Sequence, residues 1–222
     1  MTATKVLASG LLAVVASGAA HGQDTQNWKS RDDWAQTFRT AHISGVIAVC
    51  SYPEAVCQTS DETRAQQRFI PASTFKIPHL LIALDSGVTP DTNKTFKWDG
   101  TPQPLKGWER DHTYRGLLLD SVVPVFQGFA RQIGETRERA YLQKFHYGNA
   151  DVGGGIDRFW LDGALRISAA EQIAFLYQLY NNQIEAKPEF QWRTKDAMLI
   201  EATDTYVLRG KTGYSLGMPG TG

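Results

Sequence analysis

The sequence predicts an α+β fold, in which strands from both ends of the chain form an antiparallel sheet and helices fill the middle. Strand-like segments lie near the two ends, at residues 44–50 (SGVIAVC) and 205–211 (TYVLRGK). Helix signals cluster between them. The chain has 222 residues, of which 42% are hydrophobic, enough for one substantial core or two small lobes that share one. We therefore expect a sheet flanked by helices and packed against a helical lobe.

Six helices are expected in order along the chain. The first begins at Ser30, with Trp34 and Phe38 on one face. A capping box of Ser168 and Glu171 opens the fifth. Segment 58–67 is polar and is expected to be exposed, and segment 89–107 is expected to be an ordered loop with one short strand around residues 96–98. The remaining helices are expected at residues 73–85, 124–133, 135–145 and 188–202, with a glycine at or just after the end of the first two of these.

Composition and residue patterns argue against several classes of function. Lysine plus arginine equals aspartate plus glutamate at 23 each, and no basic stripe is present, so no nucleic acid partner is expected. The five histidines form no H-x-H or H-E-x-x-H pair and the two cysteines no C-x-x-C, so no metal site is expected. The glycine run 153–155 fits neither phosphate-binding pattern and indicates a flexible turn.

The start of the sequence has the pattern of an export signal. Lys5 precedes an apolar, uncharged run at residues 6–16, and small residues through Gly22 offer a cleavage site. The run is shorter than the roughly 20 residues that span a membrane, and no cysteine near the cut indicates a lipoprotein anchor. We expect a cleaved signal at residues 1–22, a periplasmic domain at residues 23–222 and no stable membrane anchor. Retention of the segment as an anchor is the alternative.

The two cysteines are expected to have a structural role. Cys50 and Cys57 flank a predicted turn at residues 51–56, so they would face each other across a hairpin and oxidise after export. Two buried free thiols are the alternative.

Ser73 and Lys76 are candidate catalytic residues. A separation of three residues places both side chains on one face of a helix, and a serine hydroxyl becomes nucleophilic when a base lies within hydrogen-bond reach. Lys76 can be that base only as a neutral amine, and burial beside Phe75, Ile77 and the apolar run 80–84 would lower its pKa. Free N–H groups at a helix N-terminus would favour an oxyanion beside Ser73. An amphipathic helix with a serine cap is the simpler alternative, since Ser-x-x-Lys occurs by chance about once in such a chain.

Three further motifs support the catalytic interpretation. In chain order the four motifs are Ser73-Thr-Phe-Lys76, Ser121-Val-Val123, Tyr147-Gly-Asn149 and Lys211-Thr-Gly213. In this order and approximate spacing the chain resembles the penicillin-recognising serine acyl transferases. Val123 in the second motif, Trp160 downstream of the third and the cysteine pair make it most similar to the class D (oxacillinase-type) β-lactamases. The resemblance runs from the first strand to the last residue.

The resemblance implies a mechanism. Ser73 would attack the lactam carbonyl and become acylated. Lys76, carboxylated by carbon dioxide, would act as general base for acylation and deacylation, so the resemblance implies no separate cofactor and no metal. Trp160 would donate its indole N–H to the carbamate, and Val123 would provide apolar cover. Without the motifs, Trp160 and Val123 would be ordinary core residues.

The resemblance also assigns proton transfer and substrate binding. Ser121 would pass a proton toward the leaving nitrogen, and Lys211 would hold the substrate carboxylate and support that transfer. The backbone N–H groups of Ser73 and Tyr214 would form the oxyanion hole. Apart from the motifs, Lys211 would be a solvated lysine at a strand end. The residues expected to bind, line or brace the substrate site are Val123, Tyr147, Asn149, Trp160, Thr212, Gly213 and Tyr214.

The implied function is hydrolysis of β-lactams of the penicillin and oxacillin class, which confers antibiotic resistance. Three alternatives stay open: a penicillin-sensing receptor domain that remains acylated, a cell-wall transpeptidase, and a non-catalytic exported binding module. The implied partners are β-lactam substrates, and a homodimer is also left open.

The sequence departs from the family pattern after its last motif. Further strands, a closing helix and an arginine that contacts the substrate carboxylate follow the Lys-Thr-Gly motif in the family, whereas this sequence stops at Gly222. The strand carrying Lys211 would then expose an unpaired apolar edge. The expectation is that the sequence is partial or truncated, and that a protein of these 222 residues alone is poorly folded and inactive.

Overall fold

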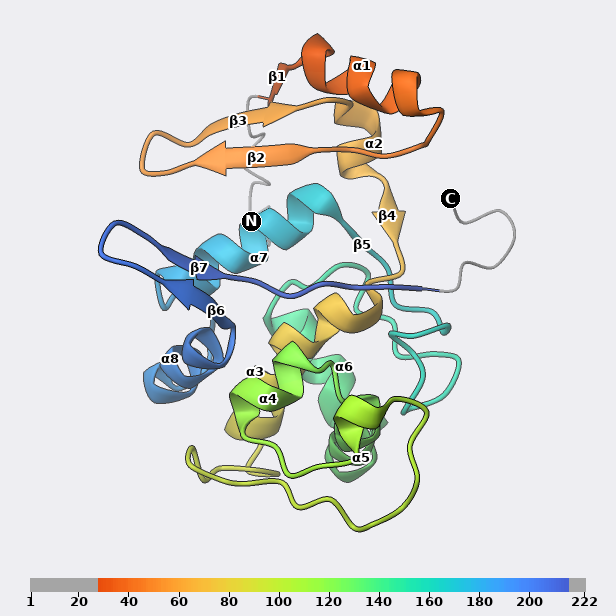
Figure 1. Cartoon of the computed structure of the whole chain (residues 1–222), viewed down its shortest axis with the longest axis vertical. Coiled ribbons are helices and arrows are strands. Elements are labelled where there is room, and N and C mark those ends of the chain that lie inside the picture. The colour runs from red at the N-terminus through yellow and green to blue at the C-terminus, as the bar shows by residue number, and fades with distance from the viewer. Residues whose placement is uncertain (1–27, 216–222) are drawn as a thin grey trace, which may run out of the picture.

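The computed structural model describes residues 28–215, so the predicted export signal at residues 1–22 lies outside the described range. The α+β class is confirmed: a three-stranded sheet lies at one end, a helical lobe at the other, and helix α7 between them (Figure 1). The helices are α1 (Asp32–Ala41), α2 (Glu62–Gln66), α3 (Lys76–Asp85), α4 (Tyr114–Leu119), α5 (Val123–Ile133), α6 (Glu135–Lys144), α7 (Ala169–Tyr180) and α8 (Pro188–Ala197), with 3₁₀ turns η1 (Ala72–Phe75) and η2 (Lys106–Trp108). The strands are β1 (Trp28–Ser30), β2 (Ala48–Ser51), β3 (Val56–Thr59), β4 (Arg68–Phe69), β5 (Ile167–Ser168), β6 (Leu199–Ala202) and β7 (Val207–Arg209).

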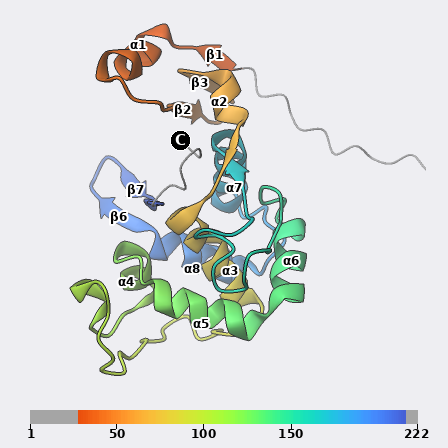
Figure 2. The ribbon, with the colours of Figure 1, turned by 90° about the vertical axis from the view of Figure 1, so that its right-hand side faces the viewer.

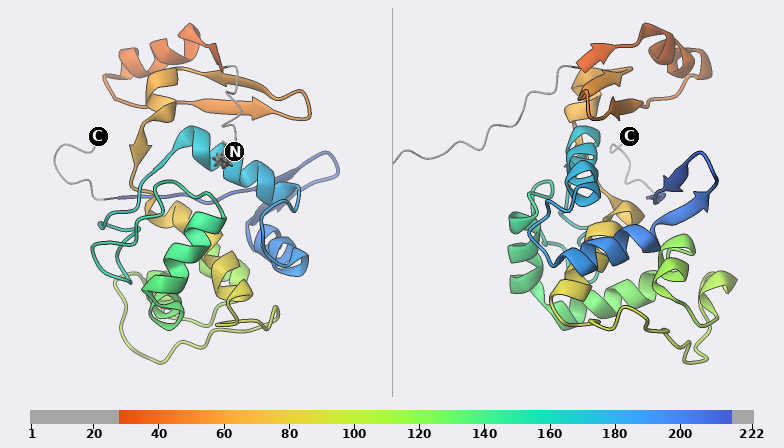
Figure 3. Two further views of the ribbon diagram at one scale, coloured as in Figure 1. Left: turned by 180° about the vertical axis from the view of Figure 1, so that it is seen from behind. Right: turned by 90° about the vertical axis from the view of Figure 1, so that its left-hand side faces the viewer.

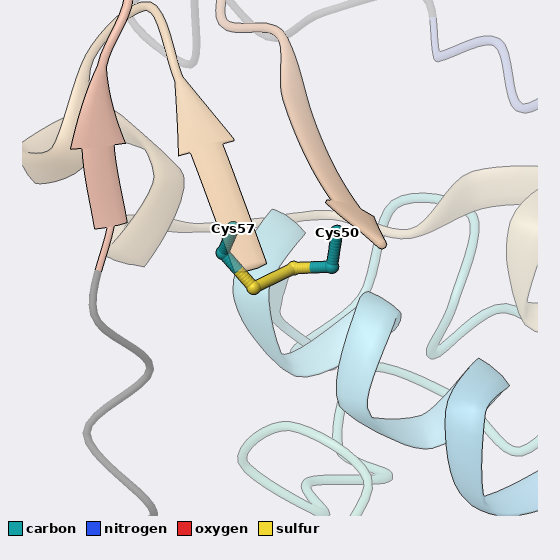
Figure 4. The surroundings of a disulfide bond; sticks show 2 residues. All are labelled: Cys50 and Cys57. Carbon is teal, nitrogen blue, oxygen red and sulfur yellow. A yellow bond between two sulfur atoms is a disulfide. The ribbon is translucent and has the colours of Figure 1, made fainter. Parts of the chain in front are cut away.

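The N-terminal sheet has the order β1-β3-β2. Strand β1 runs parallel to β3, while β2 and β3 form the expected antiparallel hairpin with Cys50 directly opposite Cys57. A disulfide joins these two cysteines (Figure 4), which confirms the predicted bridge over the alternative of two free thiols. At the turn of the hairpin, Tyr52 stacks on Tyr177 of α7 with ring centroids 3.8 Å apart, so the hairpin packs onto this helix.

The strands from the two ends of the chain do not share a ladder in the described part of the chain. Strands β6 and β7 pair with each other as a separate antiparallel hairpin, and β4 pairs with β5. Figure 3 shows the β6–β7 hairpin standing apart from the three-stranded sheet. The expected single antiparallel sheet is therefore present as two pieces among residues 28–215.

Helix α3 is the centre of the helical lobe. Every residue from Lys76 to Leu84 is buried. Apart from Lys76 and His79, this stretch is therefore apolar on all sides rather than on one face. Helices α5 and α8 pack directly against it, and Figure 2 shows α3 enclosed by α4, α5, α6 and α8. The lysine at the first position of this helix is thereby placed in the core of the lobe.

Several element boundaries differ from the predicted ones. Ser30 is the last residue of β1, and α1 begins at Asp32. Segment 58–67 is not a uniformly exposed loop, because it contains part of β3 and helix α2, with Ala65 fully buried. Helix α8 ends at Ala197, since the residues from Leu199 onward form β6. Strand β1 and helix α4 were not predicted, whereas the capping box at Ser168 is present with both of its hydrogen bonds.

Candidate active site

Ser73 and Lys76 lie side by side where η1 continues into α3. Lys76 Nζ is 2.8 Å from Ser73 Oγ, within hydrogen-bond distance. The predicted spacing is thus realised, although Ser73 lies inside a 3₁₀ turn rather than at a helix cap. Ser73 is half-buried, while the lysine side chain is completely buried. The Ser73 hydroxyl, which solvent can reach, therefore contacts the Lys76 amine, which is shielded from solvent.

Burial makes the amine of Lys76 a base near neutral pH. Desolvation, and secondarily the positive charge of Lys211, lower the pKa of Lys76 to about 7. At that pKa about half of the amine is neutral at pH 7. No carboxylate of the described residues forms an ion pair with Lys76, so nothing counteracts the desolvation.

Aromatic rings form a dry wall around the first turn of α3. Lys76 Nζ lies 5.5 Å from the centroid of Phe126 on α5. Trp160 is fully buried, and its ring centroid lies 5.5 Å from that of Phe75, the residue before Lys76. The indole Nε1 of Trp160 is buried with no hydrogen-bond partner among the described residues. Such an orphaned donor needs an acceptor in the same pocket.

Ser121 lies in the connection between α4 and α5 with a left-handed backbone (φ 56°). A non-glycine residue in this conformation costs of order 1–3 kcal/mol and is typical of functional sites. The Ser121 hydroxyl is buried and has no hydrogen-bond partner in the described part of the chain. Val123 is half-buried at the first position of α5, the helix that carries Phe126. The Ser-Val-Val motif is thereby linked to the wall of the lysine pocket.

The Lys-Thr-Gly motif follows β7 and passes beside the segment that carries Ser73. A Cβ atom at Gly213 would come within 2.9 Å of Thr74 Cγ2 and 3.0 Å of the Pro71 carbonyl oxygen, so this close approach requires glycine. Lys211 is half-buried, and burial lowers its pKa. Thr212 and Tyr214 are exposed, Tyr214 at 79%, so both are free to meet a ligand.

Tyr147 and Asn149 brace the site in the structure. Tyr147 is completely buried, and its hydroxyl donates to Gln172 Oε1 at 3.3 Å. Gln172 Nε2 in turn donates to Thr74 Oγ1 at 2.8 Å, which connects α7 to the turn that holds Ser73. Asn149 binds the backbone on both sides of Leu165, by donating to the Ala164 oxygen and accepting from the amide N–H of residue 166.

Gln172 belongs to the site, but the sequence did not indicate it. It is 98 residues from Thr74 in the chain and has no motif of its own. Two further buried polar residues near Lys76, His79 and Glu138, were also not singled out. No group of three or more His, Cys, Asp or Glu that could hold a metal occurs among residues 28–215, and no helix in that range is long and apolar enough to cross a membrane.

The arrangement is suited to acyl transfer. It contains a serine hydroxyl, a lysine amine with a lowered pKa and a second buried hydroxyl, beside the exposed residues 212–214. A cavity of about 260 Å³ lies beside the segment that carries Ser73, although Ser73 itself does not line it. Its walls are formed by residues 69–72, Thr74, residues 167–169, Gln172, Gly213 and Ser215.

Comparison with known proteins agrees with this chemistry. The chain matches the penicillin-binding protein transpeptidase domain over residues 16–218, which confirms the expected transpeptidase-like fold. It is 44% identical to the β-lactamase OXA-10 of Pseudomonas aeruginosa over 205 residues, which cover 92% of this chain and 76% of that relative. The β-lactamase OXA-48 of Klebsiella pneumoniae is 44% identical over 211 residues, covering 95% of this chain and 80% of the relative. The β-lactamase OXA-5 of P. aeruginosa is 47% identical over 182 residues, which cover 82% of this chain and 68% of that relative. With these similarities and a serine–lysine pair in hydrogen-bond contact, the chain belongs to the class D (oxacillinase-type) serine β-lactamases.

Proposed function

We propose that the protein hydrolyses β-lactam antibiotics of the penicillin and oxacillin class through an acyl-enzyme on Ser73, and that this hydrolysis confers resistance. The observation that carries the proposal is the 2.8 Å contact between Ser73 Oγ and the amine of a completely buried Lys76. Relatives that are 44% identical over most of the chain are named β-lactamases, which supports the same substrate class here.

Acylation would use residues of three motifs. Ser73 Oγ forms a bond to the lactam carbonyl carbon, the ring C–N bond breaks, and the serine proton passes to the base at position 76. The buried Ser121 hydroxyl donates its proton to the leaving nitrogen and regains one from the protonated base at position 76, so the serine proton is transferred overall to that nitrogen. Lys211 holds the substrate carboxylate and supports this transfer. The N–H groups of Ser73 and Tyr214 stabilise the oxyanion, which is worth about 3 to 4 kcal/mol per donor in other enzymes.

We also propose that Lys76 is carboxylated by carbon dioxide. The residues fit such a group, because a part-neutral amine can add carbon dioxide and the orphaned Trp160 N–H can donate to a carbamate oxygen. When present, a carbamate supplies a general base for attack of water on the acyl-enzyme. Val123, half-buried at the start of α5, provides apolar cover without a competing donor. The burial of Lys76 serves this chemistry by keeping about half of the amine neutral at pH 7.

Residues 1–22 are proposed to direct export to the periplasm, followed by a domain over residues 23–222. The apolar run at residues 6–16 and the small residues after it support this proposal. N-terminal sequencing of the protein recovered from the periplasm tests it. A mature protein that still begins at residue 1 would contradict it.

A further proposal is that these 222 residues by themselves turn over β-lactams slowly. Residues 212–214, which are assigned to substrate binding, are exposed and follow a two-stranded hairpin that has no other partner among the described residues. A loosely held binding edge weakens substrate positioning. We expect the purified chain to hydrolyse a chromogenic cephalosporin at close to the buffer rate. Turnover well above that rate would contradict this proposal.

Mass spectrometry after penicillin exposure tests the main proposal. A prolonged incubation at high penicillin concentration is expected to add one penicilloyl group to Ser73, since a single acylation is detectable even when turnover is slow. Ser73→Ala is expected to show no adduct, and Ser86→Ala, at a half-buried serine just after α3, serves as control. Absence of any adduct would favour a non-catalytic binding module. The lifetime of the adduct is measured in a longer form of the protein that binds the substrate fully. An adduct that never decays in that form would favour a penicillin-sensing domain.

A further inference from the structure

His79 and Glu138 form a completely buried imidazole–carboxyl contact one turn along α3 from Lys76. His79 Nε2 on α3 lies 2.8 Å from Glu138 Oε1 on α6, and both side chains are 0% exposed. In every other ion pair of the described residues, at least one partner is 25% or more exposed. Beyond their contact with each other, neither group has a hydrogen-bond partner within residues 28–215. The acyl-transfer chemistry proposed above does not use either residue.

The imidazole lies at the centre of the rings that enclose the lysine pocket. His79 stacks on Phe75 with centroids 4.9 Å apart and meets the Trp160 ring edge-on at 5.1 Å. It also contacts Phe126, with centroids 5.7 Å apart, and the Phe126 centroid lies 5.5 Å from Lys76 Nζ. The position of the imidazole therefore affects the residue before Lys76, the aromatic neighbour of its amine and the orphaned indole.

A buried pair of this kind does not serve stability. Taking an imidazole and a carboxyl group out of water is costly, and apolar residues of similar volume are often as stabilising or more so. A carboxyl group held 2.8 Å from one imidazole nitrogen favours one orientation of the ring, as carboxylate partners do for ligand histidines. A phenyl ring in the same place would fill the space, but no partner would fix its rotation.

We infer that His79 and Glu138 are positioning residues that hold the Trp160 indole in the orientation needed to bind the group on Lys76. This inference rests on the proposed carbamate at Lys76 and on Trp160 as its donor. Glu138 acts on His79, and His79 acts on Trp160 through ring contact, so neither residue touches the substrate.

The test measures the affinity of Lys76 for carbon dioxide in the full chain. ¹³C-labelled bicarbonate is titrated, and the carbamate carbon is followed by NMR together with the Trp160 indole N–H resonance. Glu138→Met is expected to weaken the affinity about tenfold, the lower end of what loss of an outer partner costs a bound ligand. Raised bicarbonate should restore occupancy, which a misfolded site would not allow. Glu135→Met, on the same helix but with a side chain 63% exposed, is the matched control and should leave both signals unchanged.

A double variant separates positioning from folding. His79→Phe combined with Glu138→Met replaces the pair by apolar groups, leaves no unpaired charge, and is expected to unfold at the same or a higher temperature than the unaltered protein. We expect it nevertheless to keep the weakened carbon dioxide affinity and a shifted Trp160 resonance. Unaltered affinity in the double variant would overturn the inference, because the pair would then only fill space. Absence of a carbamate signal in the unaltered protein would instead refute the proposed modification of Lys76.

Discussion

At the scale of single residues, Lys76 is the feature that most departs from ordinary protein structure. Lysines are rarely buried without a partner, yet the side chain of Lys76 is 0% exposed and has no carboxylate among the described residues. A pKa lowered from 10.5 to about 7 corresponds to about 5 kcal/mol against the charged form. The fold tolerates this cost at the place where a neutral amine is chemically useful.

This cost predicts a pH dependence of stability. The folded-state pKa of Lys76, about 7, lies below the value of 10.5 for an exposed lysine, so the folded state binds fewer protons between these pH values. Its destabilising effect is fully present below about pH 7 and disappears as the pH approaches 10. We expect Lys76→Met to unfold at a higher temperature than the unaltered protein at pH 6, with the difference shrinking by pH 9. Thermal unfolding in carbon dioxide-free buffer measures this.

Lys97→Met is the control for that experiment, because the side chain of Lys97 is 76% exposed. It should give the same small change at both pH values. An equal stabilisation by Lys76→Met at pH 6 and pH 9 would show that the lysine is not held neutral by burial.

Gly213 gives a second test at this scale. A Cβ atom there would press on Thr74 and on the Pro71 carbonyl, whereas at Gly210 it would meet only the end of the Ile200 side chain, at 3.2 Å. Gly213→Ala is therefore expected to move the Lys-Thr-Gly segment away from Ser73 and to slow acylation about tenfold or more, since small misplacements in active sites have costs of this order. Gly210→Ala should acylate nearly as fast as the unaltered protein. The rate of appearance of the Ser73 adduct by mass spectrometry compares the two, and equal rates would contradict the prediction.

The sequence predicted the site residues that belong to short motifs and missed those that act through tertiary contacts. Ser73 and Lys76 were predicted because three residues along a helix bring side chains together. Gln172 meets Thr74 across 98 residues, and His79 meets Glu138 across two helices, so no local pattern shows either pair. The left-handed backbone of Ser121 was also not predictable, because serine seldom adopts it.

At the scale of elements, predictions held where a local signal was strong. The Ser168 capping box and Gly134 after α5 give correct boundaries because each satisfies backbone groups within one turn. Strand β1 is only three residues long and depends on parallel pairing with β3, and α4 has only six residues. Their stability comes from packing partners remote in sequence, which periodicity does not report.

The disulfide gives a prediction for the N-terminal sheet. It closes a short loop between residues 50 and 57, for which chain entropy indicates about 2 to 3 kcal/mol. Replacing both cysteines by serine is expected to lower the unfolding temperature while leaving Ser73 acylation intact, because Cys57 packs with Trp28 and Ala170 in a core separate from that around Lys76. Unfolding with and without reductant measures the effect. Loss of acylation in the double serine variant would contradict this separation.

At the scale of the whole molecule, the β1-β3-β2 sheet and the β6–β7 hairpin leave apolar strand residues uncovered. Val207 and Leu208 on β7 are 50% and 46% exposed, and Val49 on β2 is 49% exposed. Open strand edges with apolar side chains favour self-association. The described part of the chain therefore has a well-packed helical lobe, whereas the β1-β3-β2 sheet and the β6–β7 hairpin each expose apolar side chains.

We accordingly expect the purified chain to associate, and Leu208→Lys to reduce this association. A charge on an exposed strand blocks edge-to-edge pairing. Light scattering across a concentration series measures the change. Leu119→Lys, at a position on α4 that is 52% exposed, is the control and should have little effect because it lies on no strand edge. Equal effects of both substitutions would point to general solubility rather than strand pairing.

The ring of Phe75 touches four others, those of His79, Tyr147, Phe159 and Trp160. This single side chain, placed between Ser73 and Lys76 in sequence, thus joins the start of α3 to two distant segments, one at Tyr147 and one at residues 159–160. Selection for a new antibiotic spectrum should leave it unchanged, whichever drug is applied. In a saturation library built in a form of the protein with full β-lactamase activity and grown under such selection, position 75 should retain only phenylalanine while exposed positions of α1 vary freely.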